Sequence, residues 1–352
     1  MKSGAKNLVI RVDAGPQIGM GHYVRCLALA QHWCFQGGRV FILTNIADKR
    51  IGEMPGVIFQ KTAERAANAG QLIEIIREKG ASWVLIDSHN FDPAFLEKVG
   101  KTEARVLFLD DDATLKKYPV DILLNQNIFA TSAMYKGKTQ ARLLLGNYYA
   151  LLRPKFLNKS AWSRKHPSVA TKLLVTFGGA APLHLSQNFL ENYSQLAPEN
   201  ILRKMSIRLI VGQMNSNFQV IKDLSKKLPN CRVLRGVTNM QDHMRWSDIA
   251  LSSGGSTVWE LSFYETPMLL MPISVPEEKI GEHMVASKAA VMIKTSKKVN
   301  FQNVFIKLSA MIKDKKHRLS LGIKAGALVD GNGALRVIHA MQSFKNLSID
   351  QK

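Results

Sequence analysis

The fold is first visible in residues 8–22, LVIRVDAGPQIGMGH, where an apolar run passes directly into a loop that contains glycines. The run 8–12 is almost continuously apolar, which is typical of a strand buried on both faces of a parallel sheet. In the loop, Gly19 and Gly21 allow close approach of the backbone and positive φ angles. A helix expected over 24–36 would turn its N–H groups and the positive end of its dipole toward an anion at this loop.

The same alternation of short apolar runs and helical patterns continues along the chain. Further strands are expected at 40–43, 83–87, 106–110, 122–125 and 143–145, and a second series at 173–177, 207–211, 232–234, 249–251, 268–271 and 291–293. Helices are expected at 64–79, 185–196, 218–228, 256–265 and 281–290, and again from Phe301 onward. Repeated βα units predict an α/β fold with right-handed crossovers.

A polar segment separates the two series of strands. Residues 153–171 are poor in apolar side chains and contain Pro154 and Pro167. The length of 352 residues is also enough for two domains. We therefore predict a first domain over 1–152, a linker over 153–171 and a second domain over 172–352, whose last helix could pack back onto the first. Two doubly wound, Rossmann-like domains would form an interdomain cleft and bind ligands at the carboxyl ends of their strands.

The composition excludes several classes of protein. Hydrophobic residues make up 46% and charged residues 21% of the chain, which are globular values and argue against a disordered chain, a coiled coil or collagen. No apolar run approaches the length of a transmembrane helix. The first residues lack the apolar core of a secretory signal. The three cysteines form neither a metal-type pair nor a disulfide framework, so we expect a reduced, cytoplasmic setting.

The net charge of +21 favours polyanionic partners. The basic residues are scattered, and no helix-turn-helix, RNA-recognition or zinc-finger signature accompanies them, so nucleic-acid binding is not expected. The excess of positive charge suits a ligand that carries a diphosphate. A weak peripheral contact with anionic surfaces is a further possibility. The nine histidines have no metal-type spacing, and Asp110–Asp112 is more often a turn than a cation site, so we expect neither a metal nor a cofactor.

His22 is the candidate catalytic residue at the first loop. It lies on the first turn of the expected helix, where the dipole disfavours a protonated imidazole. A neutral His22 could accept a proton from water. The alternative is a residue that only caps or packs the helix.

A second glycine loop lies at 252–260, SSGGSTVWE, between an expected strand and helix. Its glycines and hydroxyls suit phosphate oxygens. Glu260, one turn inside, could hold sugar hydroxyls or act only as a partner of the helix dipole. Gly178 and Gly179 follow another strand, and Arg153 could face the cleft or be a solvated linker residue.

Together these motifs resemble the UDP-2,4-diacetamido-2,4,6-trideoxy-β-L-altropyranose hydrolases, nucleotide-sugar hydrolases of pseudaminic acid biosynthesis, over nearly the whole chain. The resemblance rests on segments 11–25, 124–127 (LNQN), 151–154 (LLRP), 175–180 (VTFGGA), 253–260 and 330–334 (DGNGA). It implies a GT-B-like enzyme that uses water as its acceptor. UDP would bind the second domain, and His22 would act as general base in attack at C1 with inversion. The residues it implies for substrate binding are Asp13, Gly19, Gly21, Arg153, Gly178, Gly179, Gly254, Gly255, Ser256, Thr257, Glu260 and Glu282.

The sequence departs from the family pattern at three places. His89 stands where the family has a tyrosine, Ala181 where it has an acid, and Glu282-His283 where it has Asn-Gln. These positions are expected to face the sugar, so the UDP half of the site is better supported than the sugar half. A GT-B glycosyltransferase that uses a UDP-sugar donor and a catalytically silent nucleotide-sugar-binding protein therefore remain alternatives.

Overall fold

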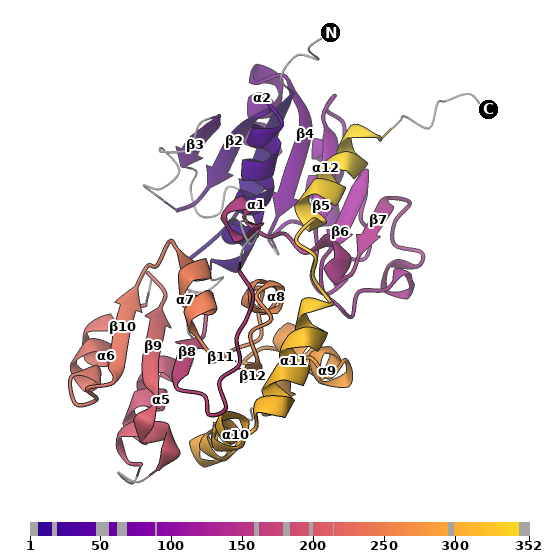
Figure 1. The fold of residues 1–352 in the computed structure, drawn as a ribbon. Helices are drawn as coiled ribbons and strands as arrows, with labels where there is room; N and C mark the ends of the chain where they lie inside the picture. The colour runs from indigo at the N-terminus through magenta and orange to yellow at the C-terminus, as the bar shows by residue number, and fades with distance from the viewer. Residues whose placement is uncertain are drawn as a thin grey trace. The chain divides into compact units, whose positions relative to one another are not determined.

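The computed structural model describes residues 6–15, 20–46, 56–61, 69–88, 90–157, 162–178, 184–196, 200–213, 215–294 and 299–344. The chain divides into two compact units (Figure 1). The first contains Met1–Asp13, His22–Pro154 and Gly331–Lys352, and the second contains Ala14–Gly21 and Lys155–Asp330. No helix within the described ranges has the length and apolar character needed to cross a membrane.

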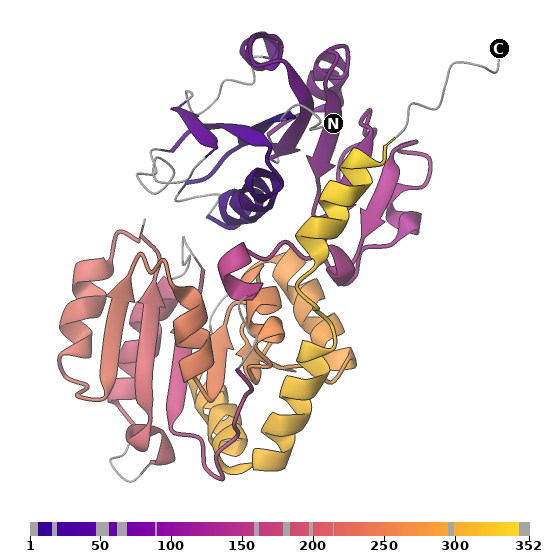
Figure 2. The same cartoon turned by 45° about the horizontal axis from the view of Figure 1, so that its top comes forward.

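The first unit is built on a parallel sheet of seven strands in the order β3-β2-β1-β4-β5-β6-β7. The strands are β1 (Asn7–Val12), β2 (Arg39–Thr44), β3 (Val57–Lys61), β4 (Ala81–Asp87), β5 (Arg105–Leu109), β6 (Ile122–Asn125) and β7 (Arg142–Leu145). The central strands are buried on consecutive residues, as their sequence predicts, because helices cover both faces. The turned view shows α1 (Gly21–Phe35) on one side of this sheet and α2 (Ala69–Glu78) with α3 (Pro93–Val99) on the other (Figure 2).

The last helix, α12 (Gly333–Gln342), belongs to the first unit although the second unit precedes it in the chain. Phe344, just beyond it, meets Trp83 edge-on with ring centroids 5.9 Å apart. At the start of α12, a Cβ on Gly333 would lie 2.2 Å from the carbonyl oxygen of Ala150. Only glycine permits this close packing of α12 against the first unit.

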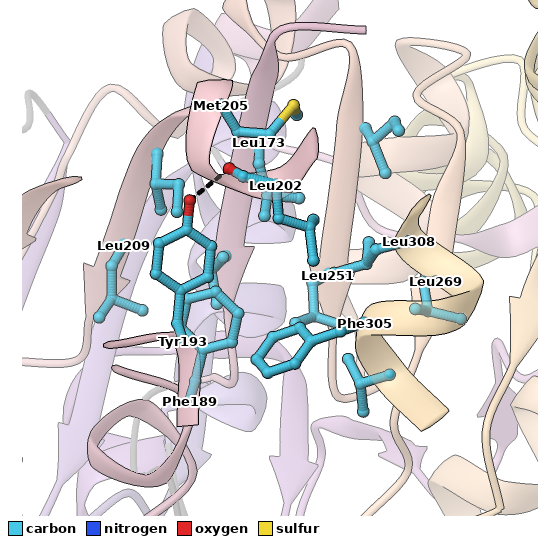
Figure 3. Packing of buried hydrophobic residues seen from close by; sticks show 14 of the residues in the cluster. Leu173, Phe189, Tyr193, Leu202, Met205, Leu209, Leu251, Leu269, Phe305 and Leu308 are labelled. Atoms are coloured by element: carbon cyan, nitrogen blue, oxygen red, sulfur yellow. Dashed lines mark hydrogen bonds between the residues drawn. The ribbon is translucent and has the colours of Figure 1, made fainter. Parts of the chain in front are cut away.

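The second unit has a parallel sheet of six strands in the order β10-β9-β8-β11-β12-β13. These are β8 (Lys172–Thr176), β9 (Ser206–Val211), β10 (Cys231–Arg235), β11 (Ile249–Ser252), β12 (Met268–Leu270) and β13 (Val291–Met292). The helices are α4 (Pro154–Leu157), α5 (Leu185–Ser194), α6 (Phe218–Ser225), α7 (Met240–Trp246), α8 (Thr257–Phe263), α9 (Val275–Ala286), α10 (Phe301–Lys313) and α11 (Lys315–Gly326). Leucines of the sheet pack against Phe189, Tyr193 and Phe305, and the Tyr193 hydroxyl donates to the carbonyl of Leu202 (Figure 3).

The prediction of two doubly wound α/β domains is confirmed, and the differences lie in single elements. The edge strand β3 was not predicted, because its run VIFQK is short and Ile58 is 55% exposed. Helix α3 was also missed, although its sequence carries the signals of a helix start. Asp92 accepts from the backbone N–H of Phe95 at 2.8 Å, and Pro93 follows the cap. Helix α9 begins six residues earlier than the expected start at 281.

Candidate functional site

His22 and Asp87 form a hydrogen-bonded pair at the carboxyl edge of the first sheet. β4 ends at Asp87, and it lies beside β1 with Val12 in register with Asp87, so the carboxyl ends of β1 and β4 lie side by side. The Nδ1 atom of His22 lies 2.6 Å from Oδ1 of Asp87, which is fully buried. Because Nδ1–H is the donor to this carboxylate, the tautomer leaves Nε2 as the basic nitrogen.

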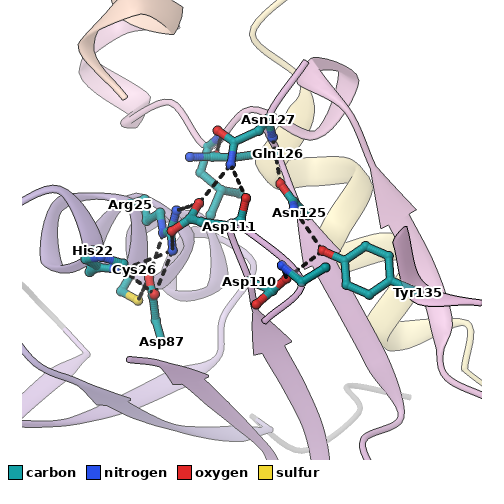
Figure 4. A network of polar contacts seen from close by, with 12 residues as sticks. His22, Arg25, Cys26, Asp87, Asp110, Asp111, Asn125, Gln126, Asn127 and Tyr135 are labelled. Atoms are coloured by element: carbon teal, nitrogen blue, oxygen red, sulfur yellow. Dashed lines mark hydrogen bonds and ion pairs between the residues drawn. The ribbon is translucent and has the colours of Figure 1, made fainter. Parts of the chain in front are cut away.

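Arg25 binds both oxygens of Asp87, including the one that contacts His22, and joins Asp87 to a second carboxylate. Its Nε and Nη2 atoms each lie 2.7 Å from the Asp87 oxygens. The same guanidinium donates to Asp111, just beyond β5, at 2.8 and 2.9 Å. The thiol of Cys26 completes the set around Asp87 at 3.3 Å (Figure 4). Every partner favours the ionised form of Asp87, so its position and its charge are both fixed.

The pKa values follow from these contacts. Burial alone would lower the pKa of His22, but the adjacent Asp87 carboxylate outweighs it and raises the pKa above its ordinary value. The direction of this shift is opposite to the one expected from the helix dipole. Burial opposes ionisation of Asp87, yet Arg25 and His22 hold the pKa of its carboxyl well below the usual range. The pKa of Asp111 is also lowered against burial, chiefly by Arg25.

A small cavity of about 20 Å³ adjoins the His22–Asp87 pair. Such a volume holds about one water molecule, provided that polar groups are present to bind it. The polar side chains at its wall include His22, Ser88 and Thr114. The remaining wall is formed by Asp87, Phe91, Phe108, Leu109, Asp110 and Leu115. A water in this cavity would therefore have hydrogen-bonding partners next to the candidate base.

The segment 124–127 is joined to Asp110 and Asp111 by hydrogen bonds. Asn125 donates to the Tyr135 hydroxyl at 2.8 Å, and Tyr135 donates to Asp110 at 2.6 Å. Asn127 donates to Asp111 at 3.0 Å. Gln126 accepts from the backbone N–H of Leu151 at 2.9 Å, which ties the segments 124–127 and 151–154 together. Within the described ranges, no three His, Cys, Asp or Glu side chains gather as a metal site would require.

Asp13, predicted to bind substrate, lies buried in the first unit. Its carboxylate is 2.6 Å from Nη1 of Arg11, and it accepts from the hydroxyl of Ser88 at 2.8 Å. Asp13 is only 2% exposed. Asp13 therefore holds the turn that follows β4, next to Asp87.

The second candidate loop opens helix α8 in the second unit. Gly254 has a φ of +105°, a conformation that favours glycine. Ser256, Thr257 and Glu260 are half-buried. The first hydrogen bond of the helix runs from Val258 N–H to the Gly255 carbonyl at 2.9 Å.

Glu277 is a carboxylate at this loop that the sequence reading missed. A Cβ on Gly255 would lie 3.2 Å from Oε1 of Glu277, and Oε2 accepts from the backbone N–H of Ile273 at 2.9 Å. Burial raises the pKa of the Glu277 carboxyl. The Ser274-x-x-Glu277 pattern of a capping box is the signal that could have located it.

The other predicted residues are spread over both units. Glu282 is exposed on α9 and pairs with Lys294 at 3.1 Å, so the structure places Glu277, and not Glu282, against the glycine loop. Arg153 is half-buried and lies next to the last residue of the segment His22–Pro154 of the first unit. Two of the predicted glycines are exposed, Gly21 as the first residue of α1 and Gly178 with a φ of +80° after β8. Gly19, Gly179, His89 and Ala181 lie outside the described residues.

Comparisons with known proteins agree with this architecture. The model of the glycosyltransferase family 28 C-terminal domain matches residues 173–320. The UDP-2,4-diacetamido-2,4,6-trideoxy-beta-L-altropyranose hydrolase of Campylobacter jejuni is 26% identical over 255 residues, which cover 72% of this chain and 86% of that protein.

Two solved structures share the fold over almost the whole chain. MurG of Acinetobacter baumannii has a TM-score of 0.62 at 13% identity, covering 96% of this chain and 100% of that one. MnaA of S. aureus in complex with UDP has a TM-score of 0.64 at 12% identity, covering 96% of each chain. The resemblance seen in the motifs is thereby confirmed: the chain is similar to the altropyranose hydrolase over 72% of its length, it has a GT-B-like fold, and residues 173–320 match the C-terminal domain of glycosyltransferase family 28.

Proposed function

We propose that the protein hydrolyses a UDP-linked 2,4-diacetamido-trideoxy sugar at C1, with inversion, to give the free sugar and UDP in nonulosonic acid biosynthesis of the pseudaminic type. The observation that carries the proposal is the His22–Asp87 pair beside a cavity of the size of one water. The name of the Campylobacter jejuni relative supports the substrate class.

The His22 imidazole would supply the base. Nε2 takes a proton from water as the water oxygen attacks C1 of the sugar, and the bond between C1 and the diphosphate oxygen breaks. The electron pair leaves with UDP. Asp87 stabilises the imidazolium that forms, and the proton then passes to solvent. A single displacement inverts the configuration at C1.

The Gly254–Thr257 loop would hold the leaving diphosphate. Backbone N–H groups and the hydroxyls of Ser256 and Thr257 suit phosphate oxygens, and their fixed dipoles stabilise the charge that develops as UDP departs. Glu260, half-buried on α8, would accept hydrogen bonds from sugar or ribose hydroxyls.

The test is a panel of UDP-sugars and CMP-sugars incubated with the protein and no acceptor. NMR would follow the free sugar and the anomer that forms first. We expect UDP release with a diacetamido-trideoxy sugar and an inverted first anomer. A retained anomer would rule out the single displacement, and no release from any donor would rule out hydrolysis.

A GT-B glycosyltransferase is the second candidate, favoured by the match of residues 173–320 to family 28. It predicts that UDP release depends on an added acceptor. UDP binding without turnover under either condition would instead point to a nucleotide-sugar-binding protein.

A further inference from the structure

A second pocket, of about 340 Å³, lies on the first unit between β7, α12 and the short helix η2 (Asn147–Tyr149). It shares no lining residue with the cavity at His22. Its volume falls within the range of pockets that hold small molecules. Of its eight lining residues, all in the described ranges, Arg142, Arg336 and His339 are basic and none is acidic. This charge pattern favours a negatively charged ligand.

Arg336 is held in place more firmly than Arg142, which is exposed. The guanidinium of Arg336 lies 3.4 Å from the centre of the Tyr148 ring, and its Nη1 donates to the Tyr148 carbonyl at 2.9 Å. Nη1 of Arg142 lies 3.4 Å from the carbonyl oxygen of Ala340, near the end of α12. Side chains fixed before binding lose little conformational entropy when an anion arrives. Arginine also presents several donors in one plane, which suits phosphate oxygens.

The other wall of the pocket is apolar and aromatic. Tyr148 is 58% exposed and Leu335 is 38% exposed. Tyr148 and Tyr149 meet edge-on with ring centroids 5.4 Å apart. Exposed faces of this kind pack against a sugar or a base. Asn332 adds a polar group just before α12.

We propose that this pocket binds a phosphorylated ring compound, with the phosphate on Arg142 and Arg336 and the ring against Tyr148 and Leu335. Two sources share this chemistry, a sugar phosphate and a nucleoside monophosphate. The pocket does not depend on the proposed hydrolase reaction, because none of its residues is assigned to that reaction.

Calorimetric titration of the full chain tests the proposal. The probes are N-acetylglucosamine 1-phosphate and UMP, each compared with its neutral counterpart, N-acetylglucosamine or uridine. We expect at least one phosphorylated probe to bind and its neutral counterpart to bind at least about tenfold more weakly, because contacts to a charged group are lost. The probe that binds more tightly identifies the source.

Three variants assign the site. Arg142→Ala with Arg336→Ala should weaken binding at least about tenfold. Leu335→Glu keeps both arginines but adds a negative charge at the pocket wall, so it should do the same even where the arginine variant folds poorly. Lys307→Ala with Lys313→Ala removes two exposed charges from α10 and should leave binding unchanged.

A fourth variant separates this site from the diphosphate loop. Ser256→Ala with Thr257→Ala should leave binding at the pocket intact. The proposal is overturned if neither probe binds, if Leu335→Glu binds normally, or if the α10 variant loses as much affinity as the arginine variant. It is also overturned if binding disappears only in the Ser256 and Thr257 variant, a result that would leave the hydrolase proposal standing.

Discussion

Replacing Asp87 with asparagine tests the central pair of the site. Asp87 is fully buried and receives hydrogen bonds from His22 at 2.6 Å and from Arg25 at 2.7 Å. Asparagine has nearly the same shape but no charge, and its amide N–H groups cannot accept from these donors. The variant therefore leaves one acceptor oxygen where His22 and Arg25 share two, and it removes one of the two carboxylates that neutralise Arg25.

The expected cost in stability comes from the buried arginine. The Arg25 side chain is 8% exposed, and removing one partner of a buried ion pair costs about 3–5 kcal/mol. Asp111 remains bonded to Arg25 at 2.8 Å, so we expect the free energy of unfolding to fall by about 3 kcal/mol, the lower end of that range. Urea unfolding at neutral pH measures it. We expect kcat to fall by roughly 10² to 10⁴, the usual contribution of a positioned base.

The pH dependence supplies an independent readout. His22 must be neutral to act as a base, so kcat/KM falls as the pH drops through its pKa. Asp87 raises that pKa, so the acid limb of the native protein should lie above the ordinary histidine value of about 6.5. In Asp87→Asn the limb should move to lower pH while the plateau falls.

The free energy of unfolding should fall at low pH, because Asp87 becomes protonated there. The pKa of the Asp87 carboxyl is depressed in the folded state, so its contribution is present above the unfolded pKa and is lost as the pH falls below about 4. Asp87→Asn should make the free energy of unfolding less dependent on pH in that range.

Asp110→Asn is the matched control. Asp110 lies just beyond the neighbouring strand β5, where it accepts hydrogen bonds from Tyr135 at 2.6 Å and from the backbone N–H of Ala113 at 2.8 Å, whereas His22 and Arg25 bond to Asp87. It should leave the acid limb of kcat/KM in place. An Asp87→Asn protein that folds and keeps both the native plateau and the native acid limb would refute the role given to this pair.

Three further outcomes are expected. His22→Asn should lower kcat by roughly 10² to 10⁴ with UDP affinity preserved, and turnover close to the native rate would remove His22 as the base. Ser256→Ala with Thr257→Ala should weaken UDP binding by roughly 1–3 kcal/mol in calorimetry, and unchanged affinity would place the diphosphate elsewhere. Gly333→Ala should cost about 3 kcal/mol in thermal or urea unfolding, because the new Cβ would lie 2.2 Å from the Ala150 carbonyl; native stability would contradict the packing at the start of α12.

Local sequence was enough to predict the fold class. Continuous apolar runs such as 8–12 and 249–251 recur between helical patterns, and a strand with two apolar faces needs helices on both sides. It was also enough to single out His22 and the loop at Gly254, because a glycine loop between a strand and a helix is a local pattern. Arg25 could have been added from sequence, since it lies three residues after His22 on the same face of α1.

Tertiary structure alone decided which residues meet. Asp87 is 65 positions from His22, and it reaches His22 because β4 inserts beside β1 with Val12 opposite Asp87. Glu277, and not the predicted Glu282, lies at the glycine loop. Helix α9 begins at Val275, so its first turn, which carries Glu277, is the part of the helix next to that loop. A run of apolar residues specifies that a strand is buried, but not which strand is its neighbour. Strand order and register depend on long-range packing, and they determine which side chains share the edge of the sheet.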